Sequence, residues 1–186
     1  MSQTREEFVR RWSPFVNQIT AGTGLFAETV LSQAIVESQG RTGLIPGTQL
    51  SRDHNNYFGI KAGSGWRGQT VSLKTGEVFN GKAVVITDAF RKYATPEDSF
   101  RDYVQFLRNN PRYTRAGVFT AKTPAEQAQA LQRAGYATNP RYAELIAAVG
   151  RGIQKWIIPN TGSIAALAAA ILFFLLITKP TKTATA

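Results

Sequence analysis

Leu31-Ser-Gln-Ala-Ile-Val-Glu-Ser-Gln-Gly40 is the stretch of this sequence that decides the fold. Apolar residues recur at helical spacing through it and just before it, and they predict an amphipathic helix with one buried stripe: Phe26, Val30, Leu31, Ala34 and Ile35. At about 100° per residue, Glu37 returns to this apolar face, whereas Glu28 points to the opposite side. Gly40 then supplies a helix stop.

The position of Glu37 allows two interpretations. A carboxyl group on the core side of a helix end is partly desolvated, which raises its pKa toward the range that a general acid needs. The same position also suits a carboxylate that is satisfied by a local hydrogen bond or salt bridge. The pattern by itself leaves both interpretations open.

The composition excludes several kinds of site. The chain has 186 residues, no cysteine and a single histidine, His54. Disulfides, a zinc site built from several His or Cys ligands, and a Cys–His dyad are therefore not available. His54 lies beside two asparagines, so we predict a solvated loop residue rather than the centre of a Ser–His–Asp triad.

The charge of the chain is strongly basic. Lysine and arginine number 22 against 12 acidic residues, a formal net charge of +10 that is spread along the sequence. A basic surface suits an anionic polymer such as nucleic acid, anionic lipid headgroups or bacterial cell wall. No Lys/Arg-rich run or helix-turn-helix pattern points to nucleic acid, and we expect no such partner.

The first third of the chain is predicted to be helix, helix and loop. Residues 1–12 lack the apolar core of a secretory signal, so we expect no signal peptide. They instead predict an amphipathic helix with three inward aromatic residues: Phe8, Trp12 and Phe15. Ser13-Pro14 starts a further turn, and Gly22-Thr-Gly24 precedes the Glu37 helix. Residues 41–57, rich in Gly, Pro, Asn and Ser, are predicted to form a loop.

A small antiparallel sheet is predicted next. Residues 66–77 and 83–93 are rich in β-favouring residues, with Gly-containing turns at Thr75-Gly76 and Asn80-Gly81. Three helices then follow, each starting at a capping residue with proline after it: Thr95-Pro96, Thr123-Pro124 and Asn139-Pro140. The fold class expected is α+β, mainly α.

The C-terminal part differs in kind. Residues 163–178 carry no charge, and the uncharged stretch extends back to Trp156. From there it reaches the ~20 residues that a bilayer helix needs, with Trp156 at the interface. We therefore predict a domain at 1–155, a transmembrane anchor at 156–178 and a short basic tail at 179–186. A buried core helix is the alternative for the shorter apolar run.

Hydrolytic chemistry would fall to the carboxylates, since histidine is scarce and cysteine absent. Three of the twelve acids are explained by helix capping: Glu97, Asp98 and Glu126. Five others lie on predicted helices, where most of them are expected to face solvent: Glu6, Glu7, Glu28, Asp102 and Glu144. Four candidates remain: Glu37, Asp53, Glu77 and Asp88. One buried helical Glu facing a small sheet that bears a second acid is the layout of a glycoside hydrolase acting on a long polymer.

Four motifs occur in order between residues 8 and 150. They are Gln33-Ala-Ile-Val-Glu-Ser38, Asn56-Tyr-Phe-Gly-Ile-Lys61, Phe90-Arg-Lys-Tyr93 with Ser99-Phe-Arg-Asp-Tyr103, and Gly135-Tyr-Ala-Thr-Asn-Pro-Arg-Tyr142. Together they resemble the glucosaminidase family of bacterial cell-wall hydrolases (glycoside hydrolase family 73), which includes autolysins and the flagellar peptidoglycan hydrolase. Any one motif is weak, but four in order are specific.

The resemblance implies a lysozyme-like fold, with helices around a cleft and a small β-lobe as the other wall, and cleavage of the β-1,4 bond after N-acetylglucosamine in peptidoglycan. Glu37 aligns with the family's catalytic acid, and Tyr136 with a tyrosine of the site. Glu77 occupies the place of a proposed second carboxylate, which activates a water unless the substrate's own acetamido group assists. The substrate-binding residues implied are Asn56, Phe58, Lys61, Tyr93 and Tyr142, although core packing is the alternative for the aromatic ones.

Two departures from the family stand out. The family often reads Glu-Ser-x-Trp-Gly, whereas Ser38-Gln39-Gly40 here lacks the tryptophan and one residue. Without this tryptophan, the resemblance does not predict which residue a sugar stacks on here, but it still predicts Glu37 as the acid. The family also commonly has export signals and wall-binding repeats, and this sequence shows neither.

These expectations combine into a membrane-anchored endo-β-N-acetylglucosaminidase that needs no metal or organic cofactor. Its membrane would be the bacterial inner membrane or the internal membrane of a phage virion. Without a signal, reaching the wall requires a virion that carries the enzyme, or translocation of the domain during lysis or secretion. Basic residues on both sides of the span do not settle its orientation. A lytic transglycosylase, a muramidase and an inactive wall-binding or membrane-tethering module are the alternatives.

Overall fold

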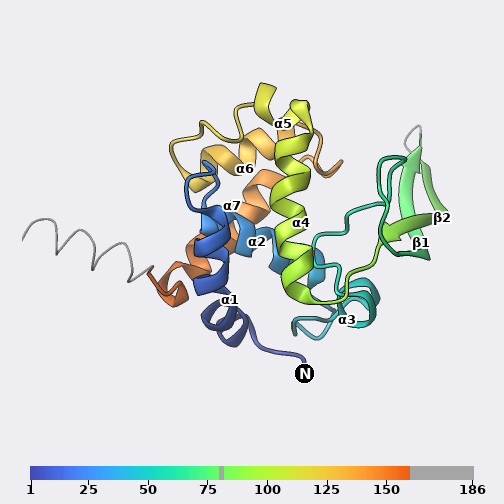
Figure 1. The fold of residues 1–186 in the computed structure, drawn as a ribbon, viewed down its shortest axis with the longest axis horizontal. Helices are drawn as coiled ribbons and strands as arrows, with labels where there is room; N and C mark the ends of the chain where they lie inside the picture. The colour runs from blue at the N-terminus through green and yellow to red at the C-terminus, as the bar shows by residue number, and fades with distance from the viewer. Residues whose placement is uncertain (80–81, 160–186) are drawn as a thin grey trace, which may run out of the picture.

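The computed structural model describes residues 1–79 and 82–159, and it consists of a helical body with one projecting hairpin (Figure 1). The helices are α1 (Arg5–Thr20), α2 (Ala27–Ser38), α3 (Gln49–His54), α4 (Pro96–Asn109), α5 (Pro111–Arg115), α6 (Pro124–Arg133), α7 (Tyr142–Ile153) and the 3-10 turn η1 (Gln154–Trp156). The strands are β1 (Thr70–Phe79) and β2 (Lys82–Arg91). The predicted α+β class, mainly α with a small antiparallel sheet, is confirmed.

Helix α2 lies at the centre of the body because it is apolar on more than one side. It packs against α1, α6 and α7, and Leu31, Ala34 and Ile35 are completely buried. The predicted apolar stripe is part of the core, but the prediction of a single buried side is wrong, because every residue from Thr29 to Ile35 is buried. Aromatic residues of α1 and α4 close the core on one side, where Trp12 stacks on Phe100 with ring centroids 5.0 Å apart.

Threonine caps start most of the longer helices. Thr95 and Asp98 form a reciprocal capping box at α4, and the Thr123 side chain accepts from the Glu126 amide at α6, so both predicted helix starts are confirmed. A further capping box, Thr4 with Glu7, starts α1. The third predicted start differs, since Asn139 caps the turn before α7 by accepting from the Arg141 amide.

Three local predictions are corrected. Pro14 does not start a new turn but lies inside α1, which runs on to Thr20. The predicted loop 41–57 contains the short helix α3, which Thr48 caps. His54 is therefore the last residue of a helix and only partly exposed, with its Nδ1 buried and unpaired among the described residues.

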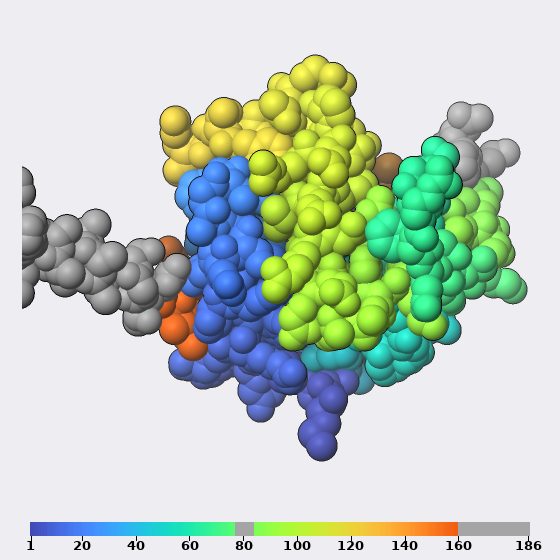
Figure 2. Space-filling model, in the orientation of Figure 1, coloured from blue at the N-terminus to red at the C-terminus, as the bar shows by residue number. Residues whose placement is uncertain are grey.

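The hairpin is longer and simpler than predicted. Strands β1 and β2 pair antiparallel from Thr70 with Arg91 to Phe79 with Lys82, so Thr75 and Gly76 lie within a strand rather than at a turn. The other predicted turn, at residues 80–81, falls outside the described residues. The hairpin stands out beside α4 rather than covering the body (Figures 1 and 2), and Val85 on it is 73% exposed.

The last described residues, which follow α7, are held against α1. Trp156 and Ile157 pack partly buried against the core. The Ile158 amide donates to Ser13 Oγ at 3.0 Å, and its carbonyl accepts from Asn17 Nδ2 at 2.8 Å. Beyond residue 159 the predicted anchor lies outside the described residues. Within the described residues, no helix is long and apolar enough to cross a membrane.

Candidate active site

Glu37 lies in the last turn of α2, one residue before the helix ends. Burial raises its pKa above the ordinary value, and a hydrogen bond from Tyr142 opposes the shift only in part. The negative end of the helix dipole also disfavours a carboxylate at this position. Both interpretations left open by the sequence have a counterpart in the structure, since the carboxyl group is desolvated and also accepts a hydrogen bond from Tyr142.

A chain of buried side chains holds Glu37 from behind. The Tyr142 hydroxyl donates to Glu37 Oε1 at 2.9 Å and accepts from Gln33 Nε2 at 2.9 Å. The Tyr103 hydroxyl in turn donates to Gln33 Oε1. Gln33 and Tyr103 are completely buried and Tyr142 is 3% exposed, so this relay is shielded from water. It fixes the rotamer of Glu37 and occupies one of its two oxygens.

The loop after α2 locks the end of the helix in place. The Ser38 carbonyl accepts from the amides of Gly47 and Thr48 at 2.8 and 3.2 Å. The backbones of Gly40 and Gly47 approach so closely that a Cβ on Gly47 would lie 2.2 Å from the Gly40 nitrogen. This close approach leaves no room for a side chain at Gly40 or Gly47.

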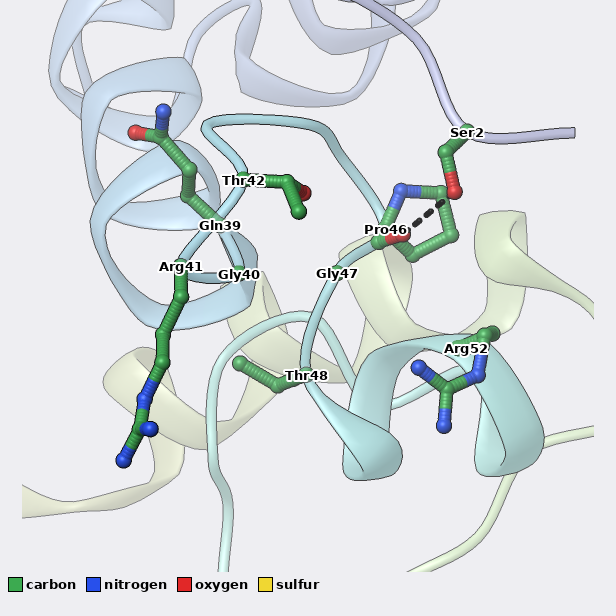
Figure 3. A pocket seen from close by; sticks show the side chains of 9 residues that line it. All are labelled: Ser2, Gln39, Gly40, Arg41, Thr42, Pro46, Gly47, Thr48 and Arg52. Atoms are coloured by element: carbon green, nitrogen blue, oxygen red, sulfur yellow. Dashed lines mark hydrogen bonds between the residues drawn. The ribbon is translucent and has the colours of Figure 1, made fainter.

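The same loop borders a shallow hollow of about 530 Å³ (Figure 3). Figure 3 shows Arg41 and Arg52 extending on either side of it, with Ser2 donating to the Pro46 carbonyl at 2.9 Å. Arg52 is paired with Asp53 at 2.9 Å. Glu37 does not line this hollow, so neither the hollow nor Asp53 belongs to the Glu37 site.

Glu37 opens instead into a cavity of about 560 Å³ between the helical body and the loop that leads to the hairpin. Residues of that loop form one wall, from Phe58 to Trp66, and Phe106, Asn110, Arg112 and Tyr113 of α4 and α5 form another. Gly59 adopts φ +64°, and a Cβ on it would lie 3.8 Å from Glu37 Oε2. The loop therefore passes directly in front of the second carboxyl oxygen.

Comparisons with known proteins show which family the chain belongs to. Residues 13–155 match the Glucosaminidase family, described as mannosyl-glycoprotein endo-beta-N-acetylglucosaminidase. The chain belongs to the glucosaminidase family. It is 38% identical over 156 residues to the peptidoglycan hydrolase FlgJ of Pseudomonas aeruginosa, covering 84% of this chain and 38% of that protein.

Two further relatives show the same relationship. The exo-glucosaminidase LytG of Bacillus subtilis is 38% identical over 124 residues, covering 64% of this chain and 41% of LytG. A mutant peptidoglycan hydrolase from Sphingomonas sp. A1 superposes with a TM-score of 0.66 at 31% identity, covering 82% of this chain and 97% of that structure. The chain thus spans less than half the length of either curated relative.

Four of the predicted site residues of this member of the glucosaminidase family line the cavity: Glu37, Phe58, Lys61 and Tyr136. The Tyr136 hydroxyl donates to the Phe58 carbonyl at 2.9 Å, and its ring stacks on Tyr142 at 5.7 Å. Lys61 lies at the mouth, 2.8 Å from Asp88, and holds the pKa of that carboxyl below its usual range. Tyr142 does not line the cavity; it reaches Glu37 from the relay.

Asn56 and Tyr93 have a different place from the one predicted. Asn56 is 1% exposed, and its amide group bonds to the backbone of Phe58, Ile60 and Arg91, so it shapes the loop and does not face the cavity. Tyr93 is also buried, and its hydroxyl donates to Asp102 at 2.6 Å. Both residues position the site without lining it.

Glu77 lies in β1 opposite Val84 rather than at a turn. Its side chain is outside the part of the structure that is described, and its predicted role stays a prediction. Among the side chains that are described, Glu37 is the one carboxylate that lines the cavity. No group of three or more His, Cys, Asp or Glu residues in that same part of the chain gathers as a metal site would.

Sequence reasoning missed two parts of the site. The relay residues Gln33 and Tyr103 lie inside the quoted motifs, but their pairing spans 70 residues and leaves no local pattern. Arg112 and Asn110 follow α4 in a segment that no motif covers, and α5 was not predicted. The one available signal was the run from residue 103 to 125, which holds four basic residues and no acidic one.

Proposed function

We propose that this chain is a peptidoglycan hydrolase that cleaves the β-1,4 bond after N-acetylglucosamine, with Glu37 as the general acid. The observation that carries the proposal is the carboxyl group itself, partly buried at a cavity wall with its pKa raised by burial. A general acid must hold its proton at the working pH, which a raised pKa allows. Membership of the glucosaminidase family supports the same reaction.

The two oxygens of Glu37 have separate roles in this mechanism. Oε1 accepts the Tyr142 hydroxyl, so Oε2, facing Gly59, is the oxygen that carries the proton to the glycosidic oxygen. Proton transfer leaves Glu37 as a carboxylate, and the Tyr142 hydrogen bond stabilises that charge. The site thus favours the acid before the step while still supporting its conjugate base after it.

The second half of the reaction has two routes. Either Glu77 activates a water, or the substrate's own acetamido group attacks the sugar carbon. Asp88 is a poor candidate because Lys61 already pairs with it. A Glu77→Gln variant separates the routes: loss of hydrolysis with the fold intact supports the carboxylate, and unchanged hydrolysis supports the acetamido group.

Mass spectrometry of the fragments released from purified peptidoglycan tests the bond that is cut. Reducing-end N-acetylglucosamine is the expected product. Reducing-end N-acetylmuramic acid would instead identify a muramidase, and 1,6-anhydro ends a lytic transglycosylase. No fragments from folded protein would indicate a wall-binding or tethering module.

We also propose that the predicted anchor at 156–178 holds the enzyme in a membrane, chiefly through its uncharged run at 163–178. The run from residue 163 to 178 is uncharged. It comes after Ile158, whose backbone is hydrogen-bonded to Ser13 and Asn17 of α1. Alkaline extraction of membranes from cells expressing the full chain should leave it in the pellet. A Leu172→Lys/Leu176→Lys variant should move to the supernatant, and release of the unaltered chain would contradict the anchor. Detection in purified virions would support carriage by a phage, and absence there would contradict it.

A further inference from the structure

The cavity in front of Glu37 carries more positive charge than a neutral sugar chain requires. Three basic side chains line it: Lys61, Arg91 and Arg112. In the proposed hydrolysis Glu37 supplies the proton, so these cations are not needed as proton donors. Their pairing within the fold shows which of them is available to a ligand.

Arg91 and Lys61 are already matched by acids. Arg91 Nη1 lies 2.7 and 2.9 Å from the two oxygens of Asp102, and the pair is only about 15% exposed. Lys61 lies 2.8 Å from Asp88. Both cations therefore have their charge balanced by the protein.

Arg112 differs from both. It is exposed at the cavity mouth, and none of the described carboxylates pairs with it. One Nη2 hydrogen is donated to the Tyr113 hydroxyl at 2.6 Å, and Tyr113 is completely buried, so the guanidinium is held by a fixed partner. Its other N–H groups have no hydrogen-bond acceptor within residues 1–79 and 82–159 and can bind a ligand. No acidic residue occurs between residues 103 and 125 to compete for them.

We propose that Arg112 binds a carboxylate of the peptide attached to the glycan strand, at the edge of the Glu37 cavity. This inference rests on the proposed function. A guanidinium held in one orientation recognises the two oxygens of a carboxylate in parallel, which a lysine cannot do. The sugars of an intact strand are uncharged, so in peptidoglycan this ligand comes from the stem peptide. Arg112 then selects peptide-bearing strands over bare chitin-like chains.

The test compares two substrates and two variants. One substrate is soluble peptidoglycan freed of phosphate-containing wall polymers, and the other is the same material with its peptide carboxylates converted to neutral carboxamides. The variants are Arg112→Gln and Arg115→Gln. Arg115 is exposed on the same helix but does not line the cavity, so it matches the change in net charge.

Arg112→Gln should lower kcat/KM on the untreated substrate about tenfold, the effect of losing one charge-assisted contact, and should leave the amidated substrate unaffected. The Arg115→Gln variant should match the unaltered protein on both. The proposal would be overturned if Arg112→Gln lowered kcat/KM equally on both substrates. It would also be overturned if Arg112→Gln and Arg115→Gln lowered kcat/KM equally. A loss seen only when phosphate polymers are left on the wall would assign Arg112 to phosphate and also overturn it.

Failure of the carboxylate site at Arg112 can be told apart from failure of the hydrolase assignment. If the unaltered protein releases no fragments from either substrate, the hydrolase assignment fails. If it hydrolyses both equally well, with Arg112→Gln unchanged, the hydrolase assignment stands and the carboxylate site alone is rejected.

Discussion

Tyr142→Phe is the substitution that tests the relay behind Glu37. It removes one oxygen atom that donates to Glu37 Oε1 and accepts from Gln33 Nε2, each at 2.9 Å. Because the Tyr142 hydrogen bond lowers the pKa of Glu37, its loss should raise that pKa further. The alkaline limb of the pH profile of kcat/KM, which reports the acid of the free enzyme, should then move to higher pH.

The same substitution has a cost in stability that can be estimated separately. Gln33 is completely buried, and without Tyr142 its Nε2 donor has no partner among the described residues. A buried donor left unpaired costs about 1–3 kcal/mol, which chemical denaturation would detect. Tyr142 does not line the cavity, so we expect the substitution to leave the cavity wall as it is.

Tyr103→Phe is the matched control. It removes the hydroxyl at the far end of the relay, which donates to Gln33, and leaves the contact between Tyr142 and Glu37 in place. It should lower stability by a similar amount while its alkaline limb stays close to that of the unaltered enzyme. The reasoning is refuted if the limb of Tyr142→Phe stays in place or moves to lower pH, or if Tyr103→Phe moves it equally.

Three further predictions concern stability. Because burial raises the pKa of Glu37, protonated Glu37 favours the folded state, and this contribution to the free energy of unfolding is fully present below the ordinary carboxyl pKa. The contribution is lost as the pH rises through the higher pKa that Glu37 has in the folded protein. Glu37→Gln should therefore increase the free energy of unfolding at neutral pH, with the gain fading toward pH ~4; destabilisation at neutral pH would contradict this. Asp102→Ala leaves the Arg91 charge about 15% exposed and unpaired, and should cost about 3 kcal/mol in urea unfolding, whereas a loss below 1 kcal/mol would not fit. Gly47→Ala forces a Cβ against the Gly40 backbone and should cost about 2 kcal/mol. Its control, Gly152→Ala, meets open space on the exposed side of α7 and should stabilise by about 0.5–1 kcal/mol in thermal unfolding.

The sequence predicted those parts of the fold that depend on local patterns. Glu37 was found because spacing at 3.6 residues per turn returns it to the apolar side of α2, which the structure buries. The starts of α4 and α6 were found because threonine and proline act there within one turn. Motif order then identified the family without any tertiary information.

The parts that were missed depend on contacts between distant residues. Tyr142 meets Glu37 across 105 residues, and Asp102 meets Arg91 between a helix and a strand. A glycine pattern predicted a turn at Gly76, but pairing with β2 keeps that residue within a strand. Asn56 looked like a site residue because it sits in a family motif, whereas its buried amide holds the loop that faces Glu37.

The central claim is that Glu37 is the general acid, and the most direct measurement is the rate of fragment release from peptidoglycan by Glu37→Gln and Glu28→Gln. Both residues lie on α2, but Glu28 lies outside the cavity lining, so the pair separates catalysis from general effects on the helix. We predict that Glu37→Gln loses activity by about a thousandfold, within the range for removal of a general acid, while Glu28→Gln stays within a few-fold of the unaltered enzyme. A folded Glu37→Gln enzyme that retains a tenth or more of the activity would contradict the assignment.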